Sequence, residues 1–197
     1  MRTEQRLARI RSVLTKRQPD LTVVMENIHD PHNVSAMLRS CDAVGVFQVQ
    51  LLYTQDEFPD IGNVGKKSSA SAKKWVDRRR FSSPEECFSK LKQEGFKIFA
   101  TRLDERAVSL YDMDLTRKVA FVFGNEHRGV SDEAAKFADE NVQIPMVGMI
   151  QSLNVSVACA VTLFEAARQR LQTGGYGSSK FSNENFERLA KEWALKE

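Results

Sequence analysis

The sequence has few of the residues that mark secreted, membrane-bound or disulfide-rich proteins. Its three cysteines, Cys41, Cys87 and Cys159, are odd in number and far apart, which predicts reduced thiols rather than a disulfide framework. No apolar run approaches the roughly 18 residues of a membrane span, and the first six residues are too charged for a signal peptide. We therefore expect a soluble, cytoplasmic protein without a membrane anchor.

The sequence also lacks a cluster of metal ligands and a dinucleotide-binding motif. The three histidines, His29, His32 and His127, have no accompanying cluster of ligands, so we expect no metal site. Residues 124–129 read Gly-Asn-Glu-His-Arg-Gly, which fails the G-x-G-x-x-G fingerprint of dinucleotide-binding folds. A nicotinamide enzyme is therefore disfavoured.

Positive charge is present but concentrated in two blocks. Residues 1–17 carry a net charge of +5 and residues 66–80 carry +6, which leaves −8 on the rest of a chain whose total is +3. Basic blocks on an acidic body predict a localised surface for a polyanion. For either block alone, a solvated helix face is an equally good interpretation.

The hydrophobic pattern predicts helices at both ends of the chain. Leu7, Ile10 and Leu14 fall at helical spacing and indicate a basic amphipathic helix over residues 1–18, which we expect to lie outside the core. Residues 174–197 contain a linker and a helix begun by Ser182. Its apolar stripe must pack on the protein's own core or on a second subunit: Phe181, Phe186, Leu189, Ala190 and Trp193.

Residues 19–173 alternate between strand and helix patterns, as in a single α/β domain. Apolar, β-branched runs predict the strands, and Ser83-Pro84 is a typical helix start. This alternation predicts a mostly parallel sheet flanked by helices. The expected strands are 21–25, 47–52, 97–101, 119–123 and 142–144, and the expected helices are 34–44, 84–94, 132–138 and 155–172.

The most informative stretch runs from Ile144 to Ala158, where an apolar strand end passes through small residues into Ser152 and Asn154. Either polar residue would cap the helix that follows, and free N–H groups at a helix start bind carboxylates or phosphates. On its own, this pattern indicates a ligand-binding loop before a helix.

Two other stretches make the interpretation specific: residues 32–39, His-Asn-Val-Ser-Ala-Met-Leu-Arg, and residues 123–131, Phe-Gly-Asn-Glu-His-Arg-Gly-Val-Ser. With residues 144–158 they resemble, in the same order, motifs 1, 2 and 3 of the SPOUT-superfamily RNA 2'-O-methyltransferases. The resemblance covers nearly the whole chain and is strongest to members that modify guanosine 18 of tRNA. Ser35 stands where many members carry glycine.

The resemblance implies a fold that periodicity does not. Alternating strands and helices alone would give an open Rossmann-like sheet, and threading a chain through a loop is rare. Family members fold their C-terminal part, here roughly residues 119–172, into a trefoil knot that holds S-adenosylmethionine. They usually complete their sites at a two-fold interface, so we expect a homodimer.

The implied activity is methyl transfer from S-adenosylmethionine to the ribose 2'-OH of a D-loop guanosine, guanosine 18, in tRNA. The alternatives are 2'-O-methylation of another tRNA or rRNA nucleotide, or a non-catalytic RNA-binding module. The cofactor residues implied by the resemblance are Thr101, Gly124, Ile144, Met146, Ser152 and Leu153.

The resemblance makes Arg39 the catalytic residue, with Asn33, Glu126, Ser152 and Asn154 as its companions. A guanidinium stays protonated at neutral pH, so Arg39 is a poor base and fits better as a clamp on the adjacent phosphate that orients the hydroxyl. Without the motifs, Arg39 reads as an exposed helix arginine, Asn33 as an N-cap, Glu126 as a loop acid, and Ser152 and Asn154 as a helix start.

The expected tRNA contacts lie on the two basic blocks and the last long helix. Residues 63–75 mix lysines with small residues and end on Trp75, a composition suited to an RNA-facing loop. For Arg168 and Arg170, a solvated helix end is the alternative. The predicted contacts are Arg6, Arg9, Arg11, Lys66, Lys67, Lys73, Lys74, Arg168 and Arg170.

Overall fold

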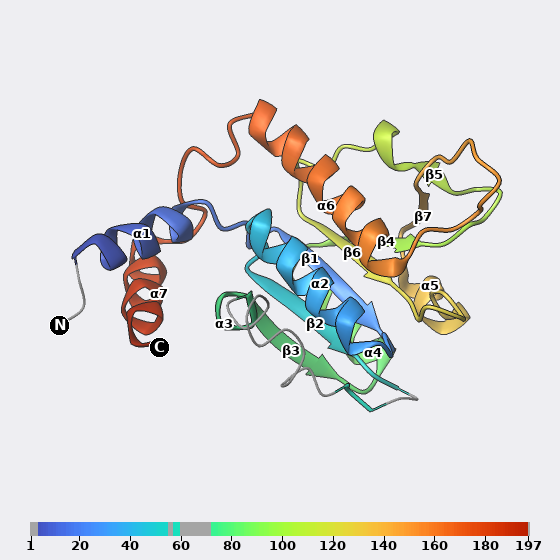
Figure 1. Cartoon of the computed structure of the whole chain (residues 1–197), viewed down its shortest axis with the longest axis horizontal. Coiled ribbons are helices and arrows are strands. Elements are labelled where there is room, and N and C mark those ends of the chain that lie inside the picture. The colour runs from blue at the N-terminus through green and yellow to red at the C-terminus, as the bar shows by residue number, and fades with distance from the viewer. Residues whose placement is uncertain (1–3, 55–56, 60–71, 197) are drawn as a thin grey trace.

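One parallel sheet forms the centre of the molecule (Figure 1). The computed structural model describes residues 4–54, 57–59 and 72–196. The seven strands lie in the order β3-β2-β1-β6-β4-β7-β5, and every described pair is parallel, as the sequence predicts. Their bounds are β1 Leu21–Glu26, β2 Gln48–Leu52, β3 Asp77–Phe81, β4 Lys97–Thr101, β5 Val108–Ser109, β6 Val119–Phe123 and β7 Glu140–Gln143.

Helices cover both faces of the sheet. Side chains of β1 alternate between the two faces: Val23 and Met25 pack under α2 (Pro31–Ala43) and α6 (Val155–Gln172), whereas Val24 packs on α4 (Pro84–Gln93) and α5 (Asp132–Phe137). Both faces of β1 are therefore buried, which explains its continuous apolar sequence. A short helix, α3 (Ala72–Trp75), and a 3-10 turn, η1 (Leu110–Asp112), complete this part.

Side chains at the helix starts fix where α2, α4 and α6 begin. Ser83 caps α4, as predicted, by accepting from the backbone N–H of Glu86. Asn154 caps α6 by accepting from the backbone N–H of Ser156 at 2.8 Å. Asp30 caps α2, so the interpretation of Asn33 as an N-cap is wrong and its side chain is available for another contact.

The first and last helices, α1 (Glu4–Thr15) and α7 (Asn183–Leu195), pack on each other beside the sheet (Figure 1). Ile10 and Leu14 of α1 and Trp193 of α7 are buried between them. The Arg17 guanidinium lies 5.1 Å from the centroid of the Trp193 ring and donates to the Val46 carbonyl at 3.1 Å, which links the pair to the segment before β2. The apolar stripe of α7 is therefore covered by the same chain, and α1 is a packed helix rather than a separate arm.

Two strands, β3 and β5, are not predicted from the sequence. β3 carries Arg78, Arg79 and Arg80 inside the second basic block, and β5 has only two residues. β3 is an edge strand, where charged side chains are tolerated because one side of the strand faces solvent. Among the described helices, none has the length and apolar character needed to cross a membrane.

Candidate active site

The three motifs meet at the carboxyl ends of β1 and β6, beside the start of α6. The Asn33 amide donates to Glu126 Oε1 at 2.9 Å, and the Asn154 amide donates to Asn33 Oδ1 at 3.1 Å. Asn33 thus joins partners that are 93 and 121 residues away in sequence. In a parallel α/β sheet this edge is where ligands bind.

The Glu126 carboxylate is held by backbone as well as side-chain donors. The N–H groups of His29 and Asp30 each donate to it at 3.1 Å. Burial raises the pKa of Glu126, but the hydrogen bonds from Asn33 and the backbone outweigh burial, so the pKa lies below its ordinary value. Glu126 is therefore an ionised carboxylate of fixed orientation.

The motif 2 loop depends on two glycines and on Asn125. A Cβ on Gly124 would lie 2.1 Å from the backbone of Gly129, and Gly129 has a φ of +68°. The buried Asn125 amide donates to the Asn27 carbonyl at 2.8 Å, and its oxygen accepts from the His127 N–H at 2.9 Å. These contacts give the loop one shape and aim Glu126 at motif 1.

Sequence reasoning missed the residues that anchor this loop to the end of β1. Glu26 is 2% exposed, and its carboxylate accepts from both the backbone N–H and the hydroxyl of Ser131, which also caps α5. Asn27 adopts a φ of 49°, a conformation that asparagine tolerates better than most residues. The available signal was a carboxylate and an asparagine directly after an apolar strand.

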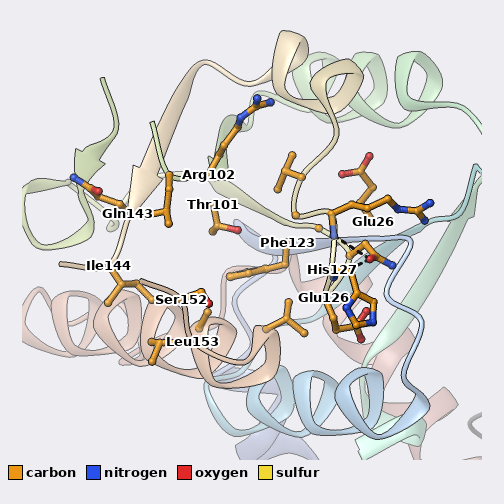
Figure 2. Close-up of a pocket in the computed structure, with 18 of the residues that line it drawn as sticks. Glu26, Thr101, Arg102, Phe123, Glu126, His127, Gln143, Ile144, Ser152 and Leu153 are labelled. Atoms are coloured by element: carbon orange, nitrogen blue, oxygen red, sulfur yellow. Dashed lines mark hydrogen bonds between the residues drawn. The ribbon is translucent and has the colours of Figure 1, made fainter. Parts of the chain in front are cut away.

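A cavity of about 940 Å³ lies beside the Asn33–Glu126–Asn154 network. In the view of Figure 2, Ile144, Ser152 and Leu153 lie on one side of it, His127 and Glu26 on the other, with Thr101 and Phe123 between. The cavity is at the upper end of the range for small-ligand sites. All six predicted cofactor residues line it: Thr101, Gly124, Ile144, Met146, Ser152 and Leu153.

The lining suits a ligand with an apolar ring at one end and charge at the other. Ile144 and Leu153 offer apolar surface on one side, and the carboxylate residues Glu126 and Glu26 line the other. S-adenosylmethionine combines an adenine ring with a positive sulfonium and an ammonium group. The residues present therefore fit this cofactor.

Arg39 lies apart from the Asn33–Glu126–Asn154 network. Six residues after Asn33 on α2, it is turned by about 120° around the helix axis. Arg39 is exposed and does not line the cavity, and within the described residues its side chain has no hydrogen bond or ion pair. The structure thus groups Asn33, Glu126 and Asn154 but leaves Arg39 facing solvent.

The predicted RNA contacts on the basic blocks differ in their surroundings. On α1, Arg6 donates to the Lys196 carbonyl, Arg11 forms an ion pair with Glu187, and Arg9 is exposed. Lys74 is exposed on α3, and Lys73 belongs to the same helix. The remaining predicted contacts, Lys66 and Lys67, lie with most of the 63–75 segment outside the described residues.

For Arg170, the expectation of an RNA contact is wrong. Its side chain is 1% exposed, pairs with Asp20, and donates to Gln18 at 2.9 Å and to the Leu115 carbonyl at 3.0 Å. Every part of the guanidinium is engaged inside the protein, so it holds α6 to the chain before β1. Arg168 is exposed but makes two hydrogen bonds of 2.8 Å to Glu165.

Among the residues that the structure describes, no group of three or more His, Cys, Asp or Glu side chains is arranged to hold a metal ion. The cysteines Cys41, Cys87 and Cys159 are all buried and free. Burial raises the pKa of Cys87 to about 12, so its thiol is protonated at neutral pH.

Known proteins are similar to this chain in both sequence and fold. The model of the SpoU rRNA Methylase family matches residues 20–164. The tRNA (guanosine(18)-2'-O)-methyltransferase of Thermus thermophilus is 46% identical over 195 residues, covering 99% of this chain and 98% of that protein.

Two solved structures extend the comparison. The TrmH/SpoU tRNA modifying enzyme of A. aeolicus superposes with a TM-score of 0.89 at 40% identity, covering 97% of this chain and 95% of its own. The SpoU methyltransferase AviRb from Streptomyces viridochromogenes, in complex with AdoMet, has a TM-score of 0.67 at 25% identity and covers 80% of this chain and 62% of its own. The three motifs, the parallel sheet and the matching family model together make this chain a member of the SpoU methylase family.

Proposed function

We propose that the protein transfers a methyl group from S-adenosylmethionine to the ribose 2'-OH of guanosine 18 in the D-loop of tRNA, in the cytoplasm. The observation that carries this proposal is the Asn33–Glu126–Asn154 network beside a cavity lined by every predicted cofactor residue. The near full-length similarity to a tRNA (guanosine(18)-2'-O)-methyltransferase supports the choice of substrate.

The cofactor supplies an activated methyl group on a positive sulfonium. The protein's part is to align the ribose oxygen with that methyl group, because in-line displacement is fast when the reacting atoms are held in place. We assign Thr101, Gly124 and Leu153 to the cofactor, together with Ile144, Met146 and Ser152. Asn33, Glu126 and Asn154 hold the motif segments in register around it.

We assign Arg39 to the RNA side of the reaction. Because its guanidinium stays protonated, it suits binding the phosphate next to the target ribose and orienting the 2'-OH rather than accepting a proton. Its exposure and its separation from the cavity support this division between cofactor residues and RNA residues.

We propose that residues 19–173 form the SPOUT domain, that residues 119–172 contain its trefoil knot, and that residues 1–18 and 174–197 are helical extensions. The order of the sheet supports the knot: β6 lies between β1 and β4, and the later helix α6 packs back on the early helix α2. The extensions form their own small core through α1 and α7.

We also propose a homodimer built on α6 rather than on α7, whose stripe is already covered. Val157, Phe164 and Leu171 recur every seven residues along α6 and are 48%, 56% and 65% exposed. Such spacing gives one apolar stripe on a helix, and an exposed apolar stripe marks an interface. Light scattering should give twice 22.3 kDa, and Phe164→Glu should give a monomer. A wild-type monomer that keeps full activity when diluted would contradict this proposal.

Tritium transfer from labelled S-adenosylmethionine to an unmodified tRNA transcript tests the proposed activity. We expect incorporation at one position, mapped by nuclease resistance to guanosine 18. The matched control is the same tRNA with a 2'-deoxyribose at that nucleotide, which should accept no label. Label that persists in the control, or maps elsewhere, would refute the assignment.

A further inference from the structure

The edge strand β3 presents its arginines to opposite faces of the sheet. Arg78 pairs in register with Val49 and Arg80 with Leu51, and both apolar partners belong to the core under α2 and α6. Side chains on neighbouring strands in register share a face, so Arg78 and Arg80 project on the α2 side and Arg79 on the α4 side. Figure 1 shows β3 at the edge of the sheet next to β2, with α2 lying over the near face of the sheet.

The arginine on one face of β3 pairs with an acid, whereas the two arginines on the other face have no acidic partner in the part of the chain that the structure describes. Arg79 pairs with Glu94 at 2.7 Å. Arg78 and Arg80 are exposed, and within the described chain neither forms an ion pair with a carboxylate. The Arg80 guanidinium instead lies 5.0 Å from the centroid of the Phe58 ring, a cation–π contact that leaves its charge without a counter-ion among these described residues.

Several other exposed arginines are paired with acids. Arg11 binds Glu187, Arg168 binds Glu165, and Arg188 binds Glu192. On the α2 face, Arg39 shares with Arg78 and Arg80 both exposure and the lack of a carboxylate partner among the described residues. This face therefore has donors available for an external anion.

A chain of contacts connects this surface to the active site. The Phe58 ring meets Tyr53 edge-on at 5.3 Å, and the Tyr53 hydroxyl donates to the Ile28 carbonyl at 2.8 Å. The next residue, His29, donates its backbone N–H to Glu126. The position of Arg80 is thus tied through packed groups to the loop that orients Glu126.

We infer that Arg78 and Arg80 bind the phosphodiester backbone of the substrate RNA and extend the RNA path from Arg39 across the edge of the sheet. This inference rests on the proposed function. Two side chains on one face of a strand are about 6.7 Å apart, which allows each guanidinium to hold a different phosphate. Backbone contacts of this kind position the RNA and do not read its sequence.

The test compares Arg78→Gln, Arg80→Gln and their double variant with Arg79→Gln, which removes the same charge from the opposite face of the same strand. The measurement is tRNA affinity as a function of salt, with KM for tRNA and affinity for S-adenosylmethionine alongside. The double variant should lower the log–log salt slope by roughly 1.4 to 1.8, at 0.7 to 0.9 per phosphate contact. Its KM for tRNA should rise about tenfold or more at moderate salt, with cofactor affinity unchanged.

Arg79→Gln should leave the salt slope at the wild-type value. An equal loss of slope in Arg79→Gln, or a wild-type slope in the double variant, would overturn the inference. If the wild-type protein still methylates tRNA in that case, the proposed function is unaffected. A wild-type protein that neither binds nor methylates tRNA would instead overturn the proposed function and this inference together.

Discussion

The motif end of the sheet and the α1/α7 pair are held together by different forces. At the motif end, the amides of Asn33 and Asn154 and the Glu126 carboxylate bond to one another. Between α1 and α7, the buried contacts are apolar, with Leu14 and Trp193 at the centre. Each hydrogen bond contributes about 1 kcal/mol net, whereas burying one large apolar side chain contributes about 1.5–3 kcal/mol.

This difference predicts opposite responses to substitution. Changes at the motif end should disturb the alignment of reacting groups and leave the fold largely intact. Changes between α1 and α7 should lower stability and leave the chemistry of the folded protein largely intact. The four predictions below test this separation, from the largest expected effect to the smallest.

Arg39→Ala should reduce methyl transfer by about 10³-fold or more, because the 2'-OH loses the group that orients it. Affinity for S-adenosylmethionine and stability should change little, since Arg39 is exposed and does not line the cavity. Arg39→Lys should restore little activity, because a point charge lacks the planar fork. Single-turnover kinetics and equilibrium cofactor binding measure the two effects. Weak cofactor binding with normal turnover at saturation would show that the division of roles is wrong.

Trp193→Ala should lower the free energy of unfolding by about 3–5 kcal/mol, because the ring is 2% exposed and packs against both Trp75 and Arg17. Urea denaturation measures the loss. Leu189→Ala, a smaller truncation in the same cluster, gives a second reading if the tryptophan variant does not fold. Turnover by the folded fraction should stay near wild type. A large fall in turnover without a fall in stability would break the proposed separation.

Glu126→Gln should lower kcat/KM about 10²-fold with a small effect on stability. Both carboxylate oxygens accept hydrogen bonds, so an amide nitrogen would face the N–H of His29 or Asp30. Because the folded-state pKa is below the ordinary value, the stabilisation by Glu126 is complete above that ordinary value and is lost as pH falls through the folded-state pKa. Urea titrations across acidic pH should show this loss in wild type and not in Glu126→Gln. If the free energy of unfolding fell equally with pH in both proteins, the assigned role of the Glu126 carboxylate in stability would be contradicted.

The smallest effect is expected on α1. If Arg6, Arg9 and Arg11 all bound phosphates, replacing them with alanine would lower the salt slope of tRNA binding by roughly 2 to 3. Because Arg6 and Arg11 are already bound to Lys196 and Glu187, we expect a decrease of about 1, from Arg9 alone. Salt titration of the triple variant distinguishes the two values. No change would leave α1 with a packing role only.

Much of the fold follows from local sequence. Apolar runs and capping residues predict five strands and the helices between them, because periodicity and caps act within a few residues. β3 was missed because Arg78 to Arg80 lacks an apolar face, and its pairing with β2 comes from the edge of a sheet already formed. The partner of α7 also depends on contacts that no local pattern specifies.

For the site, the sequence predicts which segments meet but not how their side chains bond to one another. The motifs place Asn33, Glu126 and Asn154 near one another because their segments end at the same edge of the sheet. Their direct bonds, and the anchoring of the motif 2 loop by Glu26, depend on side-chain orientations that spacing does not encode. Burial of Arg170 depends in the same way on Gln18 and Asp20, which lie on a distant segment.

The pairing of α1 with α7 has a consequence for how the protein is made. α1 emerges from the ribosome long before α7, and its buried face has no partner in the meantime. Because Thr15 and Asn183 are separated by about 170 residues, translation at roughly 5–20 residues per second leaves Ile10 and Leu14 uncovered for roughly 10–30 s. Nascent chains stalled before α7 should therefore expose a basic amphipathic helix, a form suited to chaperone binding until synthesis resumes.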